Sequence, residues 1–115
     1  MTTLQHFDLD TALDYLGGDR EFLRDLGREL LVQVPKVLAD LPGDIARRDG
    51  ESLHVHAHSL KGALGVFAAT EAAARARALE SRALEEDFEG AEEALQRLRD
   101  ELDALIPELK QELHL

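Results

Sequence analysis

The sequence has no cysteine, no tryptophan and few aromatic residues of any kind, which make up 4% of its 115 positions. Without cysteine the chain can form neither a disulfide scaffold nor a thiolate-ligated metal site. So few aromatic side chains provide no platform on which nucleic-acid bases could stack. Basic residues are scarce too, because 13 Lys and Arg stand against 24 Asp and Glu and leave a formal net charge of -11. This charge argues against nucleic-acid binding through neutralised phosphates.

Long apolar runs are also missing. No stretch approaches the roughly 18 consecutive apolar residues of a membrane-spanning helix. The first residues, Met1 to His6, lack the basic and apolar pattern of a leader. We therefore expect a cytoplasmic protein that contacts neither a membrane nor nucleic acid. The 115 residues fit a single domain, 1–115, and the start at Met1 with an end soon after the last amphipathic segment favours a free-standing protein.

Apolar residues recur at helical spacing along the whole chain, and no alternating run indicates a strand. A short first helix is expected after Asp8 or Asp10 and should end at Gly17-Gly18. Longer amphipathic helices are expected at residues 19–48, 52–67, 70–84 and 88–113. Because only short connections separate them, consecutive helices should be antiparallel. The sequence thus predicts an all-α fold, an antiparallel up-down four-helix bundle with a short additional N-terminal helix.

The prolines and caps of these helices give more local predictions. Pro35 lies within an apolar seam that continues past it, so we expect a kink there and not an end. The Pro42-Gly43 pair is expected to interrupt the same helix more strongly, with about one further turn after it. Pro107 should bend the last helix near its end, and Thr70 is a plausible N-cap of the fourth predicted helix.

His58 is the most informative residue of the chain because of its surroundings, the segment AHSLKG at residues 57–62. The flanking apolar residues form one helical stripe: Leu53, Ala57, Leu60, Leu64 and Phe67. At roughly 100° per residue, His58 lies about 140° around the helix from Leu53 and should point away from the core. Lys61 and Gly62 follow three and four residues later and share this exposed face. A mid-helix glycine costs about 1 kcal/mol relative to alanine, which suggests that another molecule comes close to this imidazole.

This arrangement favours phosphoryl transfer. A neutral imidazole is a good nucleophile near pH 7, and the Lys61 ammonium could meet the negative charge of a phosphoryl group placed on it. Gly62, and Gly65 one turn later, carry no side chain and would leave room for a protein partner to approach. Ser59 adds a nearby hydroxyl, for which we expect a secondary role. No nucleotide-binding or kinase motif accompanies the site. We expect a carrier that accepts and donates a phosphoryl group, without autonomous kinase activity.

Several stretches together match a known pattern: Phe7-Asp8 with Ala12-Leu13, residues 16–19 with 21–23, Pro35 with Leu38 and Leu41, residues 57–62, and Leu79-Glu80. With them, nearly the whole chain resembles the histidine-containing phosphotransfer (HPt) domains of two-component phosphorelays. The resemblance implies that His58 is the phosphoacceptor, that Lys61 supports the phosphoryl group and that Gly62 gives the partner clearance. It also implies a monomer that shuttles phosphoryl groups between aspartates of receiver domains, those of response regulators and of a hybrid histidine kinase. Magnesium would be supplied by the receiver, with no cofactor bound by this chain.

Two positions depart from that family. Ten residues after the histidine, where the family usually ends the helix with glycine, this chain has Ala68, which leaves the following turn in question. Arg75 takes a place that is often apolar and could reach toward a partner or into solvent. The apolar patch that would dock a receiver is not fixed by the sequence, and the candidates are Val66 on the histidine helix and residues of the neighbouring helix.

The sequence leaves two alternative functions open. His54 and His58 lie four residues apart, and Glu51-x-x-His54 has the spacing of carboxylate-bridged di-iron bundles, so a metal-binding helical bundle is one alternative. Against it, no second Glu-x-x-His exists, and the pair should point outward. A phosphorylation-dead helical adaptor is the other alternative, and the intact His58, Lys61 and Gly62 argue against it. His56, near the edge of the apolar stripe, is expected to be a partly buried packing histidine.

Overall fold

The computed structural model describes residues 5–115, which form helices joined by short connections. The helices are α1 (Leu9–Tyr15), α2 (Arg20–Ala46), α3 (Gly50–Val66), α4 (Thr70–Leu84) and α5 (Phe88–Leu113). None of the helices in this described part is long and apolar enough to cross a membrane. The predicted absence of a leader rests mainly on residues 1–4, which lie outside the described part.

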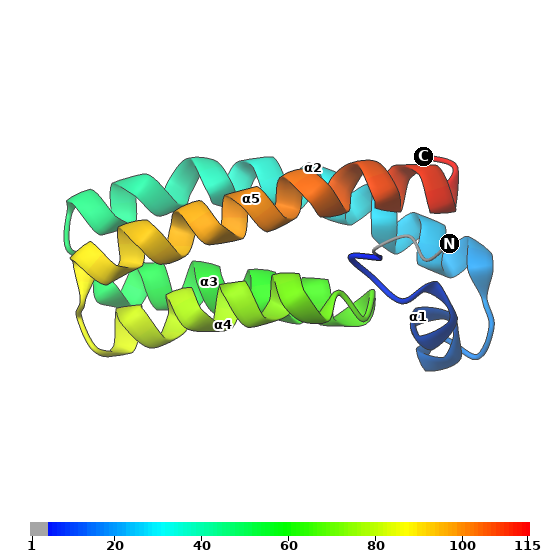
Figure 1. Ribbon diagram of the computed structural model, residues 1–115, viewed down its shortest axis with the longest axis horizontal. Helices are drawn as coiled ribbons and strands as arrows, with labels where there is room; N and C mark the ends of the chain where they lie inside the picture. Colours follow the sequence, from blue (N-terminus) through cyan, green and yellow to red (C-terminus); the bar gives the residue numbers. More distant parts are fainter. Residues whose placement is uncertain (1–4) are drawn as a thin grey trace.

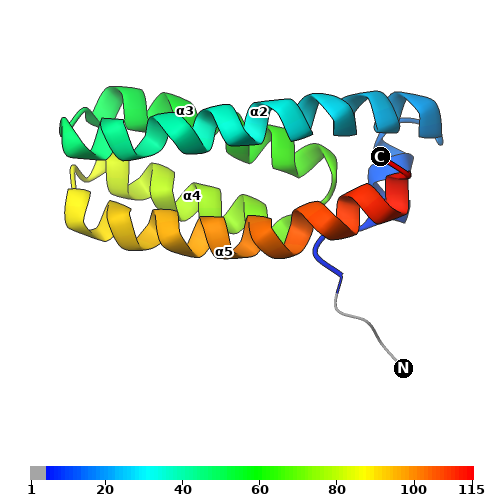
Figure 2. The same cartoon turned by 90° about the horizontal axis from the view of Figure 1, so that it is seen from above.

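The four long helices lie side by side and alternate in direction, as the colours show in Figure 1 and in the view from above in Figure 2. Along this bundle α2 and α4 run one way and α3 and α5 run back. The short helix α1 lies at the end where α2 begins and α5 ends. Residues 5–115 contain no strand, so the predicted all-α bundle with a short extra N-terminal helix is confirmed.

Aspartates begin most of these helices. The side chains of Asp8, Asp19, Asp49 and Asp87 each accept a hydrogen bond from the backbone N–H three residues later, at 2.9–3.1 Å. Such caps satisfy N–H groups that have no partner within the helix. Helix α4 is the exception, since its N-cap is Ala69, which makes no side-chain cap bond. The prediction that Thr70 caps this helix is therefore wrong, because the turn is short enough for Thr70 to be the first helical residue.

Helix α2 continues without a break through Pro35 and Pro42. The interruption predicted at Pro42-Gly43 is wrong, because Asp44 and Ile45 extend the buried face of the helix beyond Leu41. Packing of that face outweighs the backbone hydrogen bonds that the prolines cannot make. In α5 the helix also continues past Pro107, and Figure 2 shows its C-terminal end leaning away from the line of its first turns.

The connection between α3 and α4 contains Ala68 in the left-handed backbone region, with φ of 52°. The Ala68 N–H donates to the Gly65 carbonyl at 3.0 Å, and the Ala69 N–H donates to the Leu64 carbonyl at 3.3 Å. This is the turn that glycine favours at a helix C-terminus. The turn thus forms with alanine where the resemblance noted above leads one to expect glycine, at a steric cost of about 1 kcal/mol.

The core is built from the apolar faces that the sequence predicts. The buried side chains of α4 are mainly alanines, so α4 can pack closely against its neighbours. Fully buried leucines, each worth about 1.5–3 kcal/mol on burial, occupy the centre. They are Leu23, Leu30, Leu41, Leu53, Leu60, Leu64, Leu79, Leu98, Leu102, Leu105, Leu109 and Leu113. This packing fixes α3 against α4, which is the pair that carries the site described below.

Two acidic residues, Asp44 and Glu80, are buried among the described residues. Asp44 accepts hydrogen bonds from Ser52 Oγ at 2.8 Å and from Arg47 at 3.0 Å, and its second oxygen lies 2.6 Å from His56 Nδ1. His56 is partly buried, as predicted, but it is held by a hydrogen bond with Asp44 and not by packing alone. Asp44 thereby links α2 to the first turns of α3.

Candidate functional site

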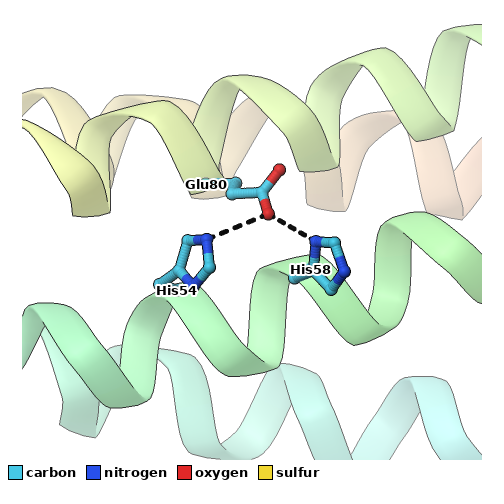
Figure 3. A group of neighbouring side chains, drawn as sticks. All are labelled: His54, His58 and Glu80. Carbon is cyan, nitrogen blue, oxygen red and sulfur yellow. Dashed lines mark hydrogen bonds and ion pairs between the residues drawn. The ribbon is translucent and has the colours of Figure 1, made fainter.

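His58 projects from the middle of α3 with 62% of its side chain exposed. Its predicted position opposite the buried stripe is confirmed, since Leu53, Ala57 and Leu60 are all fully buried. The imidazole Nδ1 lies 2.6 Å from Glu80 Oε2 on α4. Figure 3 shows the other ring nitrogen, Nε2, pointing away from Glu80. One nitrogen is therefore engaged with the protein while the other is available to an approaching group.

Glu80 bridges His58 and Lys61 of α3. Its Oε1 accepts a hydrogen bond from Lys61 Nζ at 2.7 Å, while Oε2 faces the His58 ring. The hydrogen bond from Lys61 lowers the pKa of Glu80 below its ordinary value, and the hydrogen bond from His58 adds to this effect, although burial acts in the opposite direction. An ionised carboxylate can only accept hydrogen bonds. His58 Nδ1 must then carry a proton, and in the neutral imidazole this leaves the lone pair on Nε2 free.

Lys61 lies one helical turn after His58, as the spacing predicts, with 27% of its side chain exposed. Its ammonium group is tied to Glu80 and so lies on the same side of α3 as the imidazole. The charge is held near His58 by a carboxylate on the neighbouring helix.

Gly62 and Gly65 face open space. A Cβ atom built on either glycine would have nothing within 4 Å, and both residues are exposed. Their φ angles are ordinary, so neither backbone conformation nor packing within the described chain requires glycine there. Because these two residues have no side chains, the helix surface within two turns after His58 leaves room for another molecule.

Ser59 is exposed and turns toward α2, where its Oγ accepts a hydrogen bond from Gln33 Nε2 at 3.2 Å. It makes no side-chain hydrogen bond with His58 among the described residues. Arg75 pairs with Glu71 of its own helix at 2.7 Å. Among the described residues, neither side chain forms a hydrogen bond or ion pair with His58.

Two exposed valines lie near the site. Val55 precedes His58 by one turn on α3 and is 57% exposed, and Val32 on α2 is 58% exposed and adjacent in sequence to Gln33. Val66, the candidate suggested by the sequence, is partly buried and packs against the core. The exposed apolar surface beside His58 therefore lies toward α2.

His54, His58 and Glu80 could hold a metal ion. One ligand atom from each residue lies within 4.8 Å of the other two, and His54 Nε2 is 3.2 Å from Glu80 Oε2 (Figure 3). Within residues 5–115 this is the one cluster of three or more potential ligands. It sits at the surface between α3 and α4, whereas the di-iron arrangement considered above needs ligands in the bundle interior.

Glu80 is the site residue whose role the sequence does not reveal. It falls four residues after Ala76 and three before Ala83, on the buried face of α4. An acidic residue on an otherwise apolar helical face is a signal that it has a partner, because an unpaired buried carboxylate is costly. The signal does not say which partner, since Lys61 and His58 lie 19 and 22 residues away in sequence.

A family model described as Hpt domain matches residues 20–112. The match runs from the first residue of α2 to the residue before the end of α5, and it includes every site residue described above. Among curated proteins and among solved structures, no significant match was found.

Proposed function

Because the chain belongs to the Hpt domain family, we propose that it is a phosphorelay intermediate that accepts a phosphoryl group on His58 from a receiver-domain aspartate and passes it to another receiver. Hpt domains are phosphoryl carriers, not autonomous enzymes, and they interact with receiver domains. We propose in particular that receiver aspartates are the phosphoryl donor and acceptor, and that His58, Lys61 and Gly62 form the site. The magnesium ion of the reaction would be held by the receiver.

The contact between His58 Nδ1 and the buried Glu80 carboxylate carries this proposal. With the proton on Nδ1, the Nε2 lone pair attacks phosphorus, and the bond between phosphorus and the receiver aspartate breaks. The aspartate leaves as a carboxylate, and the phosphorylated imidazole gains positive charge. Glu80 offsets that charge through Nδ1, and donation to a second receiver reverses these steps.

Lys61 supplies the positive charge that the phosphoryl oxygens need. Its Nζ is bonded to Glu80 and lies one turn from His58, so a rotation of its flexible side chain could bring it to the phosphoryl group. The open surface at Gly62 and Gly65 admits the loops of a receiver. The valines at positions 32 and 55 provide apolar contact on the α2 side.

The direct test is transfer of radiolabelled phosphate from a phosphorylated receiver to the His58→Gln variant. We expect no acceptance, with a change in the free energy of unfolding below about 1 kcal/mol because His58 is exposed. His54→Gln is the matched control, since His54 lies on the same face and should leave acceptance intact. Label on His58→Gln would assign the phosphoacceptor to another residue, and a wild-type protein that binds receivers without being labelled would favour an adaptor.

A further inference from the structure

We propose that His54, His58 and Glu80 form a site for one divalent transition-metal ion such as Zn²⁺, and that the bound ion suspends phosphoryl acceptance by His58. Metal binding at these three residues is independent of the proposed function, whereas the inhibition of phosphoryl acceptance rests on it.

The positions of the three ligands support a single-ion site. The two histidines lie one turn apart on α3, with ring centroids 5.8 Å apart and planes inclined by 20°. Glu80 Oε2 lies between them, 3.2 Å from His54 Nε2 and 2.6 Å from His58 Nδ1. Ligand atoms around tetrahedral zinc are about 3.3 Å apart, given metal–nitrogen distances near 2.0–2.1 Å. A small rotation of the exposed His58 ring would open the shorter distance to this value.

The chemistry of the ligands selects the kind of ion. Two imidazoles and one carboxylate oxygen suit zinc and similar transition metals, whereas magnesium and calcium prefer sets of oxygen ligands. The histidines face solvent, so a water molecule could complete a fourth position. Phosphoryl transfer as proposed does not use His54, whose one ion-pair partner among the described residues is Glu80.

Metal binding would change which nitrogen of His58 carries the proton. Without metal, the Nδ1–H group of the neutral imidazole donates a hydrogen bond to Glu80, and Nε2 has a free lone pair. With metal on Nδ1, a neutral imidazole must carry its proton on Nε2. That nitrogen then has no lone pair with which to attack phosphorus. Lys61 can keep its bond to Glu80 Oε1, so the fold need not change.

The binding test uses the full chain without any receiver, and measures Zn²⁺ affinity by competition with a chromophoric chelator. We expect one Zn²⁺ per wild-type chain, and a loss of at least tenfold in affinity for His54→Gln, His58→Gln and Glu80→Gln. The control is His114→Asn, which removes an imidazole elsewhere, and asparagine tolerates the left-handed backbone of that position. Absence of stoichiometric binding, or equal affinity in wild type and His54→Gln, overturns the site whatever the outcome for phosphoryl transfer.

The second test compares transfer from one phosphorylated receiver to wild type and to His54→Gln, with and without Zn²⁺. We expect equal transfer without zinc, and inhibition of wild type by at least tenfold at a zinc concentration that leaves His54→Gln within twofold of its own rate. Any effect of zinc on the receiver is common to both proteins and cancels. Equal inhibition of the two proteins overturns the suspension of acceptance, while failure of transfer in both without zinc would instead contradict the proposed function.

Discussion

Glu80 links the two side chains of α3 for which we propose a role in phosphoryl transfer, because one carboxylate bonds both His58 and Lys61. Replacing it with glutamine keeps the shape but removes the negative charge that holds the Nδ1 proton and offsets the phosphorylated imidazole. We expect Glu80→Gln to slow phosphoryl acceptance by at least roughly tenfold. The rate of labelling by a phosphorylated receiver measures this effect, and an unchanged rate would show that phosphoryl acceptance does not depend on the negative charge of Glu80.

The lowered pKa of Glu80 also predicts how stability varies with pH. Lys61 and His58 favour the ionised carboxylate in the folded protein, so the unfolded chain takes up a proton first as pH falls below the ordinary value of 4.5. The stabilising contribution is therefore complete above that pH and is lost as pH falls through the lowered folded value. Urea unfolding of wild type and Glu80→Gln should show a constant gap near neutral pH that narrows in acid. A gap that widens in acid would contradict the direction of the shift.

Substitutions at Gly62 can distinguish an effect on helix stability from an effect on the approach of a partner. We expect Gly62→Ala to raise the free energy of unfolding by up to about 1 kcal/mol, because a Cβ there meets no other atom and alanine favours the helix. Gly62→Gln should preserve the helix but slow transfer from a receiver, whose loops would meet the longer side chain.

Acetyl phosphate or phosphoramidate provides the matched donor for this variant. These compact donors should label Gly62→Gln almost as fast as wild type. Equal slowing with both kinds of donor, or loss of stability in Gly62→Ala, would assign the glycine to the helix backbone and not to partner access.

At the scale of elements, the turn between α3 and α4 contains a strained residue, and a single substitution should relieve the strain. Ala68, with φ of 52°, occupies the left-handed position between α3 and α4. Ala68→Gly should stabilise the protein by about 0.5–1 kcal/mol, since glycine adopts this conformation without a steric penalty. Thermal or urea unfolding measures the change. Ala74→Gly, at an exposed position inside α4, is the control and should lose about 1 kcal/mol.

Helix limits could be predicted from the sequence where they depend on residues close together in the chain, such as capping residues and regularly spaced apolar residues. Asp87 caps α5 within three residues, and the apolar spacing gave α4 and α5 their observed limits, Thr70–Leu84 and Phe88–Leu113. The continuation of α2 through Pro42 was not predictable in this way, because it depends on how the face containing Ile45 packs against other helices. Tertiary packing there outweighed the local preference of the Pro42-Gly43 pair.

The same limit applied to the site. His58, Lys61 and Gly62 share one helical face, so their proximity followed from spacing alone. Glu80 joins them only through the packing of α4 on α3, and no rule based on neighbouring residues could supply that pairing. The sequence therefore singled out His58, the proposed nucleophile, but not the carboxylate that accepts a hydrogen bond from its Nδ1.

At the scale of the whole molecule, a receiver needs a docking surface larger than the histidine and its immediate neighbours. Val32 and Val55 are the exposed valines that flank the site on its α2 side. We expect Val32→Glu and Val55→Glu to slow transfer from a receiver by roughly tenfold, because each places a charge in an interface that excludes water. Labelling by acetyl phosphate should stay unchanged. Leu84→Glu, at an apolar residue 69% exposed near the end of α4, is the control and should behave as wild type.

The pairing of His58 with Glu80 has a consequence for the order of folding. These two residues are 22 positions apart, whereas the contact between Arg24 and the Leu113 carbonyl, which ties α2 to the end of α5, spans 89 positions. Closing the shorter loop costs about 1 kcal/mol less chain entropy than closing the longer one. The helical hairpin of α3 and α4 can therefore assemble before the chain ends meet. A refolding molecule would bring His58 and Glu80 together as this hairpin forms, ahead of the closure of the bundle.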